Sequence, residues 1–195
     1  MECPKCNDKS KYNSRRMNIQ FETKRLIIRE YTKDDFDAIY GILSDEETMQ
    51  HYPKPFDENK VRDWIKWNIE NYEIFGFGLW AVVLKDTGEM IGDCGITMQM
   101  IGNKIKPEIG YHIHKKYWNK GLGTEVARKC RDYIFENTPF NIIYSCMKCS
   151  NVGSYSVAIK NGMQKVDEFE DDINTITKVY AISRNEWLKL KKYYI

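Results

Sequence analysis

The chain of 195 residues has no apolar run close to the roughly 20 residues that a membrane-spanning helix needs. It also has no internal repeat and no low-complexity tract, which excludes a solenoid or a compositionally biased array. The net charge is only +2, so charge alone neither indicates nor excludes a nucleic-acid partner. Residues 1–6 (MECPKC) are polar, unlike a secretory signal. We therefore expect a cytoplasmic protein with no membrane partner.

The composition is that of a globular chain, with 42% apolar and 30% charged residues. The length suits one domain with a sizeable core. Charge is uneven, because residues 1–25 hold seven basic side chains against three acidic ones. We expect a basic N-terminal tail at residues 1–19, which can be an extension outside the native fold, and one domain at residues 20–195. Met17 is an alternative start, because the patterned sequence begins after it.

Six cysteines are present, and two pairs have the C-x-x-C spacing of zinc ligands, Cys3 with Cys6 and Cys146 with Cys149. The pairs lie 140 residues apart, so no local motif joins them. The plainer interpretation is one pair in the tail and two cysteines at a strand end. In a reducing cytosol such thiols stay reduced. We therefore expect no metal site.

Periodicity and turn signals predict an alternation of strands and helices. Strands are expected at residues 25–31, 79–84, 89–100, 109–113, 141–147, 164–170 and 175–183, with a loop at 102–107. Helices are expected at residues 32–43, 57–75, 124–136 and 151–160, with a last one after the capping box at 183–186. Hairpins combined with one strand–helix–strand crossover predict an α+β fold. Its sheet should be mixed and mostly antiparallel, with about seven strands flanked by four or five helices.

The most informative stretch is residues 118–123 (WNKGLG), which follow a strand-like run and open into a helix-like run. A helix start offers free backbone N–H groups and the positive end of the helix dipole, and both attract phosphate. Gly121 and Gly123 have no Cβ, so a pyrophosphate can approach the backbone closely. The alternative is an ordinary strand–helix connection with glycines for tight packing. On its own, this glycine turn predicts only a phosphate site.

Three segments occur in order along the chain: residues 23–29, the glycine turn at 118–123, and residues 151–163. Together they resemble the GNAT acyltransferase superfamily. The glycine turn is similar to its acetyl-CoA motif, Gln/Arg-x-x-Gly-x-Gly/Ala, with Trp118 in the first position. That departure is typical of the branch of ribosomal-protein alanine N-acetyltransferases. Residues 151–154 (NVGS) with 160–163 (KNGM), and the opening residues 23–29 (TKRLIIR), are also similar to that branch. The resemblance covers about residues 20–190 and implies the GNAT fold.

The resemblance implies that acetyl-CoA is the co-substrate. Backbone N–H groups of the glycine turn would hold the pyrophosphate, and the pantetheine arm would pair with the preceding strand and then reach Asn151. Asn151 can also be a plain helix cap. The residues expected to bind acetyl-CoA are His112, Ile113, His114, Asn119, Lys120, Gly121, Leu122, Gly123, Thr124, Asn151 and Ser154.

The family reaction is attack of an amine on the thioester, which needs a base, an oxyanion donor and an acid for the thiol. Glu108 is the expected base, because this branch often has Glu there; the alternative is a solvated carboxylate at a strand end. Ser154 matches the serine proposed to protonate the thiolate, and the alternative is a helix serine that contacts backbone. The tyrosine that many superfamily members have seven residues after Asn151 is replaced by Ala158.

We therefore expect an acetyl-CoA-dependent N-acetyltransferase that acts on a primary amine, either a protein N-terminus or a small molecule. The alternative is a CoA-sensing or nucleic-acid-binding module that has lost catalysis and carries the cysteine-bearing tail. Nucleic acid is not an expected partner of the favoured enzyme, and a homodimer stays open. Aromatic residues at this spacing often build cores, but candidates for lining the acceptor pocket are His51, Tyr52, Trp64, Trp80 and Tyr111.

Overall fold

The computed structural model describes residues 20–170 and 175–192, so the expected tail at 1–19 lies outside the described residues. The described part contains eight strands and five α-helices. The strands are β1 (Gln20–Glu22), β2 (Leu26–Arg29), β3 (Leu79–Leu84), β4 (Met90–Ile101), β5 (Lys104–Ile113), β6 (Ile142–Lys148), β7 (Gln164–Glu170) and β8 (Ile176–Ser183). The helices are α1 (Phe36–Leu43), α2 (Glu58–Phe75), α3 (Leu122–Asn137), α4 (Val152–Lys160) and α5 (Arg184–Lys192). None of these helices is long and apolar enough to cross a membrane.

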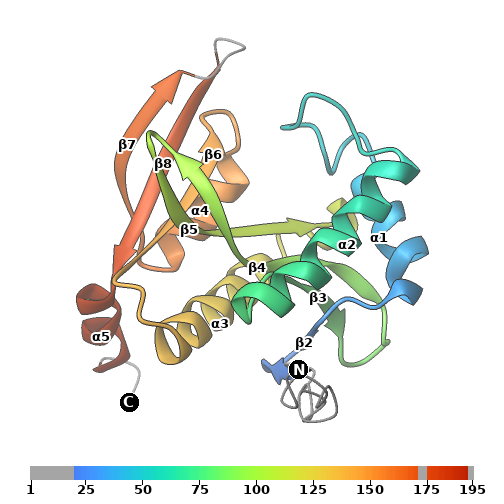
Figure 1. Ribbon diagram of the computed structural model, residues 1–195, viewed down its shortest axis with the longest axis horizontal. Helices are drawn as coiled ribbons and strands as arrows, with labels where there is room; N and C mark the ends of the chain where they lie inside the picture. The colour runs from blue at the N-terminus through green and yellow to red at the C-terminus, as the bar shows by residue number, and fades with distance from the viewer. Residues whose placement is uncertain (1–19, 171–174, 193–195) are drawn as a thin grey trace, which may run out of the picture.

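The strands form a single sheet in the order β1-β2-β3-β4-β5-β6-β8-β7. Neighbouring strands are antiparallel throughout, except that β5 and β6 run parallel. The parallel contact arises because α3 carries the chain back across the sheet between these two strands. Figure 1 shows β6, β7 and β8 leaning away from the layer of β2 to β5. The expected α+β fold, with a mixed and mostly antiparallel sheet, is confirmed.

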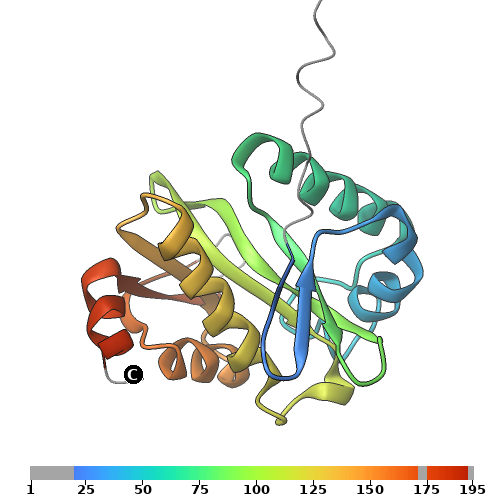
Figure 2. The same cartoon turned by 90° about the horizontal axis from the view of Figure 1, so that it is seen from below.

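Helices cover both faces of this sheet (Figure 2). Two neighbouring residues of β4 show which helix lies on which face, because successive strand side chains point to opposite sides. Asp93 bonds to Trp64 of α2, whereas Cys94 interacts with Cys130 of α3. The middle of the sheet is therefore enclosed between a layer of α1 and α2 and a layer of α3 and α4.

Caps fix the ends of the helices, as the sequence predicts. Asp57 accepts a hydrogen bond from the Lys60 backbone N–H at 2.9 Å, and Gly76 ends α2 with a left-handed φ of 75°. Thr32 and Asp35 form the reciprocal capping box ahead of α1. Each such cap contributes about 1 kcal/mol of stability. The start of α3 differs, because its N-cap is a glycine and no side chain caps it.

The structure departs from the sequence expectation in three places. β1 is an additional strand, too short to show an alternating pattern. β5 begins inside the expected loop at 102–107, because Ile101 and Lys104 pair across a two-residue turn in which Gly102 has a φ of 62°. α3 begins at Leu122 rather than two residues later, which brings both residues that follow Gly121 into its first turn.

Candidate active site

The sheet opens in its middle, between the parallel strands β5 and β6. A single residue pair, Glu108 with Tyr144, is in register between them. Just beyond this pair, the Ser145 hydroxyl donates to the Ile109 carbonyl oxygen at 3.1 Å, and the Cys146 backbone N–H donates to the Glu108 carboxylate at 2.8 Å. Side chains thus replace backbone pairing at this point, and the two strands part.

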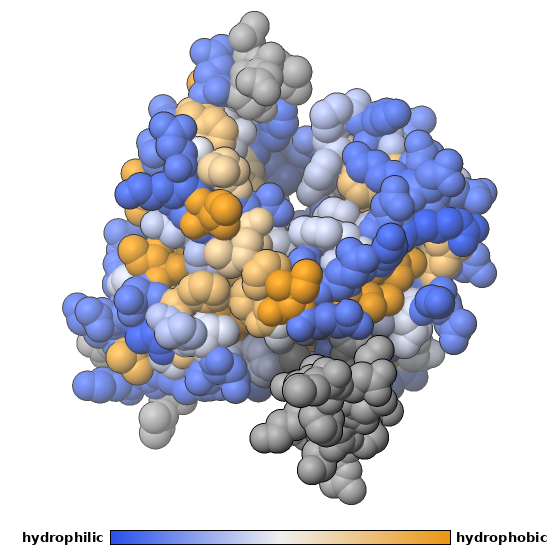
Figure 3. Space-filling model, in the orientation of Figure 1, coloured by the Kyte–Doolittle hydropathy of each residue, from blue (hydrophilic) through white to orange (hydrophobic). Residues whose placement is uncertain are grey.

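The parted strands border a cleft of about 1150 Å³. Its walls come from β5, β6, the glycine turn, the first turn of α4 and the loop between α1 and α2. Figure 3 shows the surface hollowed between the arm of β6 to β8 and the helices facing it. Of the predicted site residues, the cleft is lined by Glu108, His112, Ile113, Asn119, Gly121, Leu122, Gly123, Thr124, Asn151 and Ser154, but not by His114 or Lys120.

The backbone of β5 turns alternate residues toward the cleft. The His114 N–H donates to a carbonyl of the neighbouring β4 region at 2.9 Å. In an antiparallel pair every second residue bonds to the same neighbour, so the backbone N–H of His112 also points toward β4. The Ile109 carbonyl accepts from β6 instead, on the cleft side. The N–H groups that face the opening are therefore those of Tyr111 and Ile113. A pantetheine arm would pair with these two residues, because the sheet already uses the N–H of His114.

The glycine turn leaves backbone N–H groups free at the start of α3. Asn119 (φ 59°) and Gly121 (φ 75°) both adopt the left-handed conformation, which bends the chain sharply ahead of the helix. Within α3 the Glu125 N–H pairs with the Gly121 carbonyl at 3.0 Å. The N–H groups of the three residues before Glu125 have no partner inside the helix. Together with the helix dipole they form an anion-binding site of pyrophosphate character.

A side-chain cluster supports this turn from behind. Arg25 donates to the Lys120 carbonyl at 2.9 Å and to the Glu125 carboxylate at 2.7 Å, and Thr23 donates to the same carboxylate at 2.5 Å. Burial alone would raise the pKa of Glu125, but these bonds lower it. A negative charge in the first turn would repel a phosphate, and Arg25 neutralises it. The conspicuous opening segment, residues 23–29, therefore contacts the phosphate turn directly.

Glu108 lies where the strands part and has the electrostatics of a base that works near neutral pH. Burial raises the pKa of its carboxyl to about 7, although the Cys146 N–H bond opposes the rise. Such a group is partly ionised at pH 7 and takes up protons readily. Cys146 also donates its thiol toward Glu108, and burial first of all raises the pKa of that thiol well above its usual range. The thiol is therefore protonated and is not a nucleophile.

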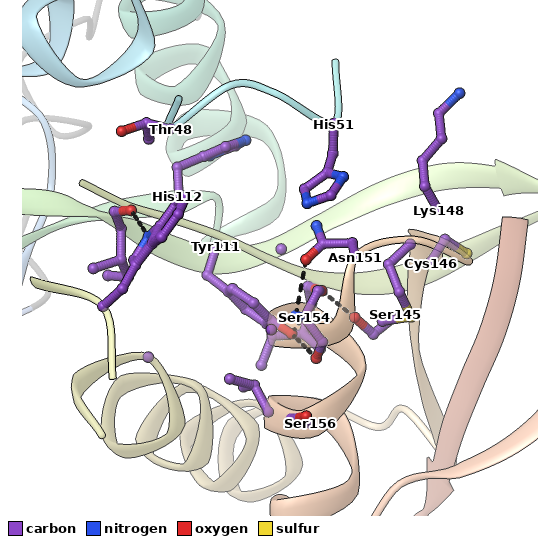
Figure 4. Close-up of a pocket in the computed structure, with 18 of the residues that line it drawn as sticks. Thr48, His51, Tyr111, His112, Ser145, Cys146, Lys148, Asn151, Ser154 and Ser156 are labelled. Atoms are coloured by element: carbon purple, nitrogen blue, oxygen red, sulfur yellow. Dashed lines mark hydrogen bonds between the residues drawn. The ribbon is translucent and has the colours of Figure 1, made fainter. Parts of the chain in front are cut away.

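Ser154 and Asn151 lie together at the start of α4 (Figure 4). The Asn151 side chain accepts from the Ser154 backbone N–H at 3.0 Å, which makes Asn151 the N-cap of α4. The Ser154 hydroxyl lies 3.0 Å from the Tyr111 hydroxyl, which donates to the Ser154 carbonyl at 2.8 Å. Tyr111 has one proton, so in this arrangement the serine hydroxyl donates to the tyrosine oxygen. Both interpretations of Asn151 stay compatible, since a cap leaves its amide N–H groups for a ligand.

The loop between α1 and α2 forms the opposite wall of the cleft. Lys115, just after β5, holds this loop through an ion pair with Asp45 at 2.9 Å. His51 lies 3.5 Å from the Ser150 hydroxyl, beside the start of α4. Burial lowers the pKa of His51, so its imidazole is neutral at pH 7. The loop therefore brings a neutral imidazole to the mouth of the cleft near Asn151 (Figure 4).

Tyr52 and Trp64 also line this wall, but Trp80 does not. Tyr52 contacts the ring of His112, with its hydroxyl 2.6 Å from Nε2. Trp80 is fully buried in the core, where it packs against Phe21. Of the aromatic candidates, Trp80 is thus a core residue, because every position of β3 up to Val83 is buried.

The cysteines do not form a metal site within residues 20–170 and 175–192, which contain no group of three or more His, Cys, Asp or Glu suited to a metal. Cys146 is half-buried at the cleft and Cys149 is exposed. Cys3 and Cys6 lie outside the described residues, so a pairing of the two C-x-x-C segments stays untested.

One buried side chain that contacts a cleft residue escapes the sequence reasoning entirely. Asp93 is fully buried in β4 and bonds to the side chain of His112 at 2.7 Å. The sequence offers one hint of this residue, a carboxylate between a glycine and a cysteine in an otherwise apolar strand. An unpaired charge is costly in such a strand, so a partner for Asp93 can be expected. The partner, however, is 19 positions away and comes from strand register. The supporting role of Arg25 likewise depends on a contact across about half of the chain.

Known proteins share the sequence family and the fold of this chain. Residues 25–164 match the family described as "Acetyltransferase (GNAT) domain". The chain is 35% identical to YkkB of Bacillus subtilis over 72% of this chain and 83% of that protein. It is 30% identical to the N-acetyltransferase YnaD of the same species, over 87% and 99%. The ribosomal-protein-S5-alanine acetyltransferase of Vibrio fischeri shares the fold, with a TM-score of 0.72 at 15% identity over 87% and 98% of the two chains.

Proposed function

The chain belongs to the GNAT acetyltransferase family, and we propose that it transfers the acetyl group of acetyl-CoA to a primary amine by direct attack on the thioester. One observation carries this proposal. A single cleft joins a helix start that suits a pyrophosphate to a carboxyl group whose pKa is about 7. Binding of a phosphorylated donor and removal of a proton from an amine are the two tasks that the reaction needs.

The donor would lie along β5. Its pyrophosphate would meet the N–H groups of Leu122, Gly123 and Thr124, and its pantetheine amides would pair with the cleft-facing backbone of Tyr111 and Ile113. This placement brings the thioester to the point where β5 and β6 part. Of the two cleft-facing N–H groups, that of Ile113 would then serve a pantetheine amide, and that of Tyr111, nearer the point where the strands part, would receive the oxyanion that forms during attack.

Glu108 would accept the proton of the attacking amine. Free amines have pKa values of roughly 8 to 10 and are mostly charged at pH 7. A carboxylate with a pKa near 7 can take up this proton directly or through a water. The neutral nitrogen then attacks the thioester carbon and forms a tetrahedral intermediate. As the C–S bond breaks, the sulfur leaves as a thiolate and the nitrogen loses its second proton to water, so that a neutral amide forms.

The Ser154 hydroxyl would return a proton to that thiolate. It lies against the Tyr111 hydroxyl, whose pKa burial raises above its usual range, so the tyrosine stays protonated. In the resting arrangement the serine donates to the tyrosine oxygen, so for this transfer the Ser154 O–H would turn to the sulfur. The Tyr111 O–H would turn from the Ser154 carbonyl to the serine oxygen and replace its proton, and water would return a proton to Tyr111. This pair would supply the acid that Ala158 cannot.

The acceptor class that we favour is a protein N-terminus. The sequence resembles the ribosomal-protein branch, and a ribosomal-protein-S5-alanine acetyltransferase has the same fold. A small amine is the alternative, because function follows the acceptor wall rather than the fold. The cytoplasmic location and the homodimer remain predictions.

A screen of amines that records free CoA tests the proposal. Purified protein is mixed with acetyl-CoA and, in turn, peptides with free N-termini, amino sugars and polyamines. Thiol release should require both acetyl-CoA and one class of amine, and a reaction without amine controls for hydrolysis. Absence of release with every amine, together with no acetyl-CoA binding near micromolar concentrations, would refute the function.

A further inference from the structure

Asp93 is a buried carboxylate with four hydrogen-bond contacts. Its Oδ2 accepts from the Tyr31 hydroxyl at 2.9 Å and from the Trp64 indole at 3.0 Å. Its Oδ1 lies 2.7 Å from His112 Nδ1 and 3.2 Å from the His112 backbone N–H. Burial alone would raise the pKa of Asp93, but the charge of His112 and these bonds lower it. A buried carboxylate is stabilised by such hydrogen bonds and by a positive partner.

His112 is that partner, and it connects Asp93 to the cleft. Its other ring nitrogen, Nε2, lies 2.6 Å from the Tyr52 hydroxyl. Burial alone would lower the pKa of His112, but the Tyr52 oxygen at Nε2 and the Asp93 carboxylate 2.7 Å from Nδ1 raise it above its usual range. Both ring nitrogens of an imidazolium are donors, so Nε2–H points at the tyrosine oxygen.

The Tyr52 hydroxyl then donates its own proton to a group other than His112. A phenol has one proton, and its oxygen here accepts from the imidazolium. Tyr52 lines the cleft and is 44% exposed, while the edge of its ring packs against Phe56. The free direction for the proton is the cleft, so Tyr52 presents a fixed hydrogen-bond donor to a ligand.

The two faces of β5 divide the cleft between the two substrates. The Tyr111 side chain points to Ser154 and α4, on the side of the expected thioester (Figure 4). The next side chain, His112, lies on the other face of the strand and contacts Tyr52. Glu108 shares the face of His112, four residues away and so roughly 13 Å along the strand. Tyr52 therefore meets a part of the acceptor other than the amine handled at Glu108.

The charged side chains that line the cleft restrict which classes of amine can be the acceptor. Among the described residues that line it, Glu108 is the single carboxyl group. The positively charged side chains there are His112, Lys148 and Lys160, whereas His51 is neutral. A polyamine or an aminoglycoside would meet several positive groups and one carboxyl group. An amine that carries a carbonyl or carboxylate oxygen would instead accept a hydrogen bond from the Tyr52 hydroxyl.

We propose, on the basis of the proposed acetyl transfer, that Tyr52 binds an oxygen atom of the acceptor and that Asp93 and His112 are positioning residues for its hydroxyl. The acceptor class is then an amine with a hydrogen-bond-accepting oxygen, as in a peptide or an amino acid amide, rather than a polycation. The chain thus holds a specificity device made of Tyr52, His112 and Asp93 that is separate from the glycine turn.

Kinetics with three acceptors test this assignment: a tripeptide amide with a free N-terminus, an alkylamine of the same length and spermidine. The tripeptide should be the best acceptor of the wild-type protein. Tyr52→Phe should raise its KM roughly three- to tenfold, the effect of losing one hydrogen bond to a carbonyl oxygen, and should leave the KM for acetyl-CoA and for the alkylamine unchanged. The matched control is Tyr40→Phe, which removes a hydroxyl in α1 away from the cleft.

His112→Ala should show the same selective rise in KM, and His112→Gln should recover part of it, because an amide N–H can still donate to Tyr52. If a His112 variant does not fold, Tyr52→Phe alone decides. An unchanged preference for the tripeptide in Tyr52→Phe, or a wild-type preference for spermidine, would overturn the assignment. Acetyl-CoA binding without transfer to any of the three amines would instead refute the transfer reaction itself, and the assignment with it.

Discussion

The two halves of the cleft are built in different ways. The half around the glycine turn consists of backbone groups from one continuous segment, held in place by the φ values of Asn119 and Gly121. The half around Tyr52 consists of side chains from α2, β4, β5 and the loop after α1. A backbone-built half can serve one common donor in many proteins, whereas a side-chain half can change its acceptor by single substitutions. The difference predicts that variants in the two halves affect different substrates.

Gly121→Val should break the backbone-built half and have the largest effect. Valine cannot hold a φ of 75° without strain, so the turn changes conformation and its N–H groups no longer point to the expected pyrophosphate. Acetyl-CoA affinity should fall roughly 100-fold, as expected for the loss of one or two charge-assisted hydrogen bonds. Calorimetric titration with acetyl-CoA measures this loss.

Gly88→Val is the matched control, because Gly88 has a φ of 71° in a turn outside the cleft. Both variants should lose about 1–2 kcal/mol of stability from the left-handed conformation. Equal acetyl-CoA affinity in the two variants would show that Gly121 matters only for folding.

Glu108→Gln should slow acetyl transfer and leave the affinity for acetyl-CoA unchanged. The value of kcat/KM should fall about 100-fold, because a general base is lost. In the wild-type protein, kcat/KM should rise with pH through about 7, as Glu108 loses its proton. The variant should lose this rise, which a pH profile with a fixed amine measures.

The same substitution should stabilise the fold at high pH. The pKa of Glu108 is raised from 4.5 to about 7, so the folded state binds more protons than the unfolded state in this window. Wild-type stability from this group therefore falls as pH rises from 4.5 to 7, by about 3 kcal/mol. Denaturant unfolding should show Glu108→Gln gaining on the wild type between pH 5 and pH 8. A constant difference across this range would contradict the raised pKa.

Asn151→Ala should sharpen the comparison, because Asn151 belongs to both a helix cap and the expected pantetheine site. Loss of the cap should cost about 1 kcal/mol of stability. If its amide also binds the donor, acetyl-CoA affinity should fall about tenfold. Asp57→Ala removes the same kind of cap from α2 outside the cleft. Matching stability losses with no difference in acetyl-CoA affinity would leave Asn151 as a cap alone.

Arg25→Ala should have the smallest effect, because it supports the turn from behind. Its bond to the Lys120 carbonyl is exposed, so acetyl-CoA affinity should fall only about threefold. Lys85→Ala, which removes an exposed ion pair with Glu22 elsewhere on the sheet, is the control and should leave the affinity unchanged. Equilibrium titrations of both variants decide whether Arg25 acts on the turn.

The same division explains what could be predicted from the sequence. The helices with caps, the hairpins and the glycine turn are local signals, and the structure has them close to the expected positions. β1 and the early start of β5 were hidden, because three residues show no period and Gly102 allows a tighter turn than a loop of six residues. Sequence patterns that extend over a few residues cannot predict such elements.

The side-chain half depended on contacts far apart in sequence. Tyr52 and His112 are separated by 60 positions, and Asp93 meets His112 only through the register of β4 with β5. The sequence could point to Tyr52, Trp64 and His112 separately, but not to their connection through one buried carboxylate. Trp80 looked similar to Tyr52 in the sequence and lies in the core, because strand burial is decided by the layers on both faces.

Initial-rate kinetics with both substrates varied test the division of the cleft most directly. Wild type, Gly121→Val and Tyr52→Phe are compared with acetyl-CoA and a peptide amine, and free CoA is recorded. Gly121→Val should raise the KM for acetyl-CoA and leave that for the peptide, and Tyr52→Phe should do the reverse. A rise in the same KM for both variants would contradict a cleft with separate donor and acceptor halves.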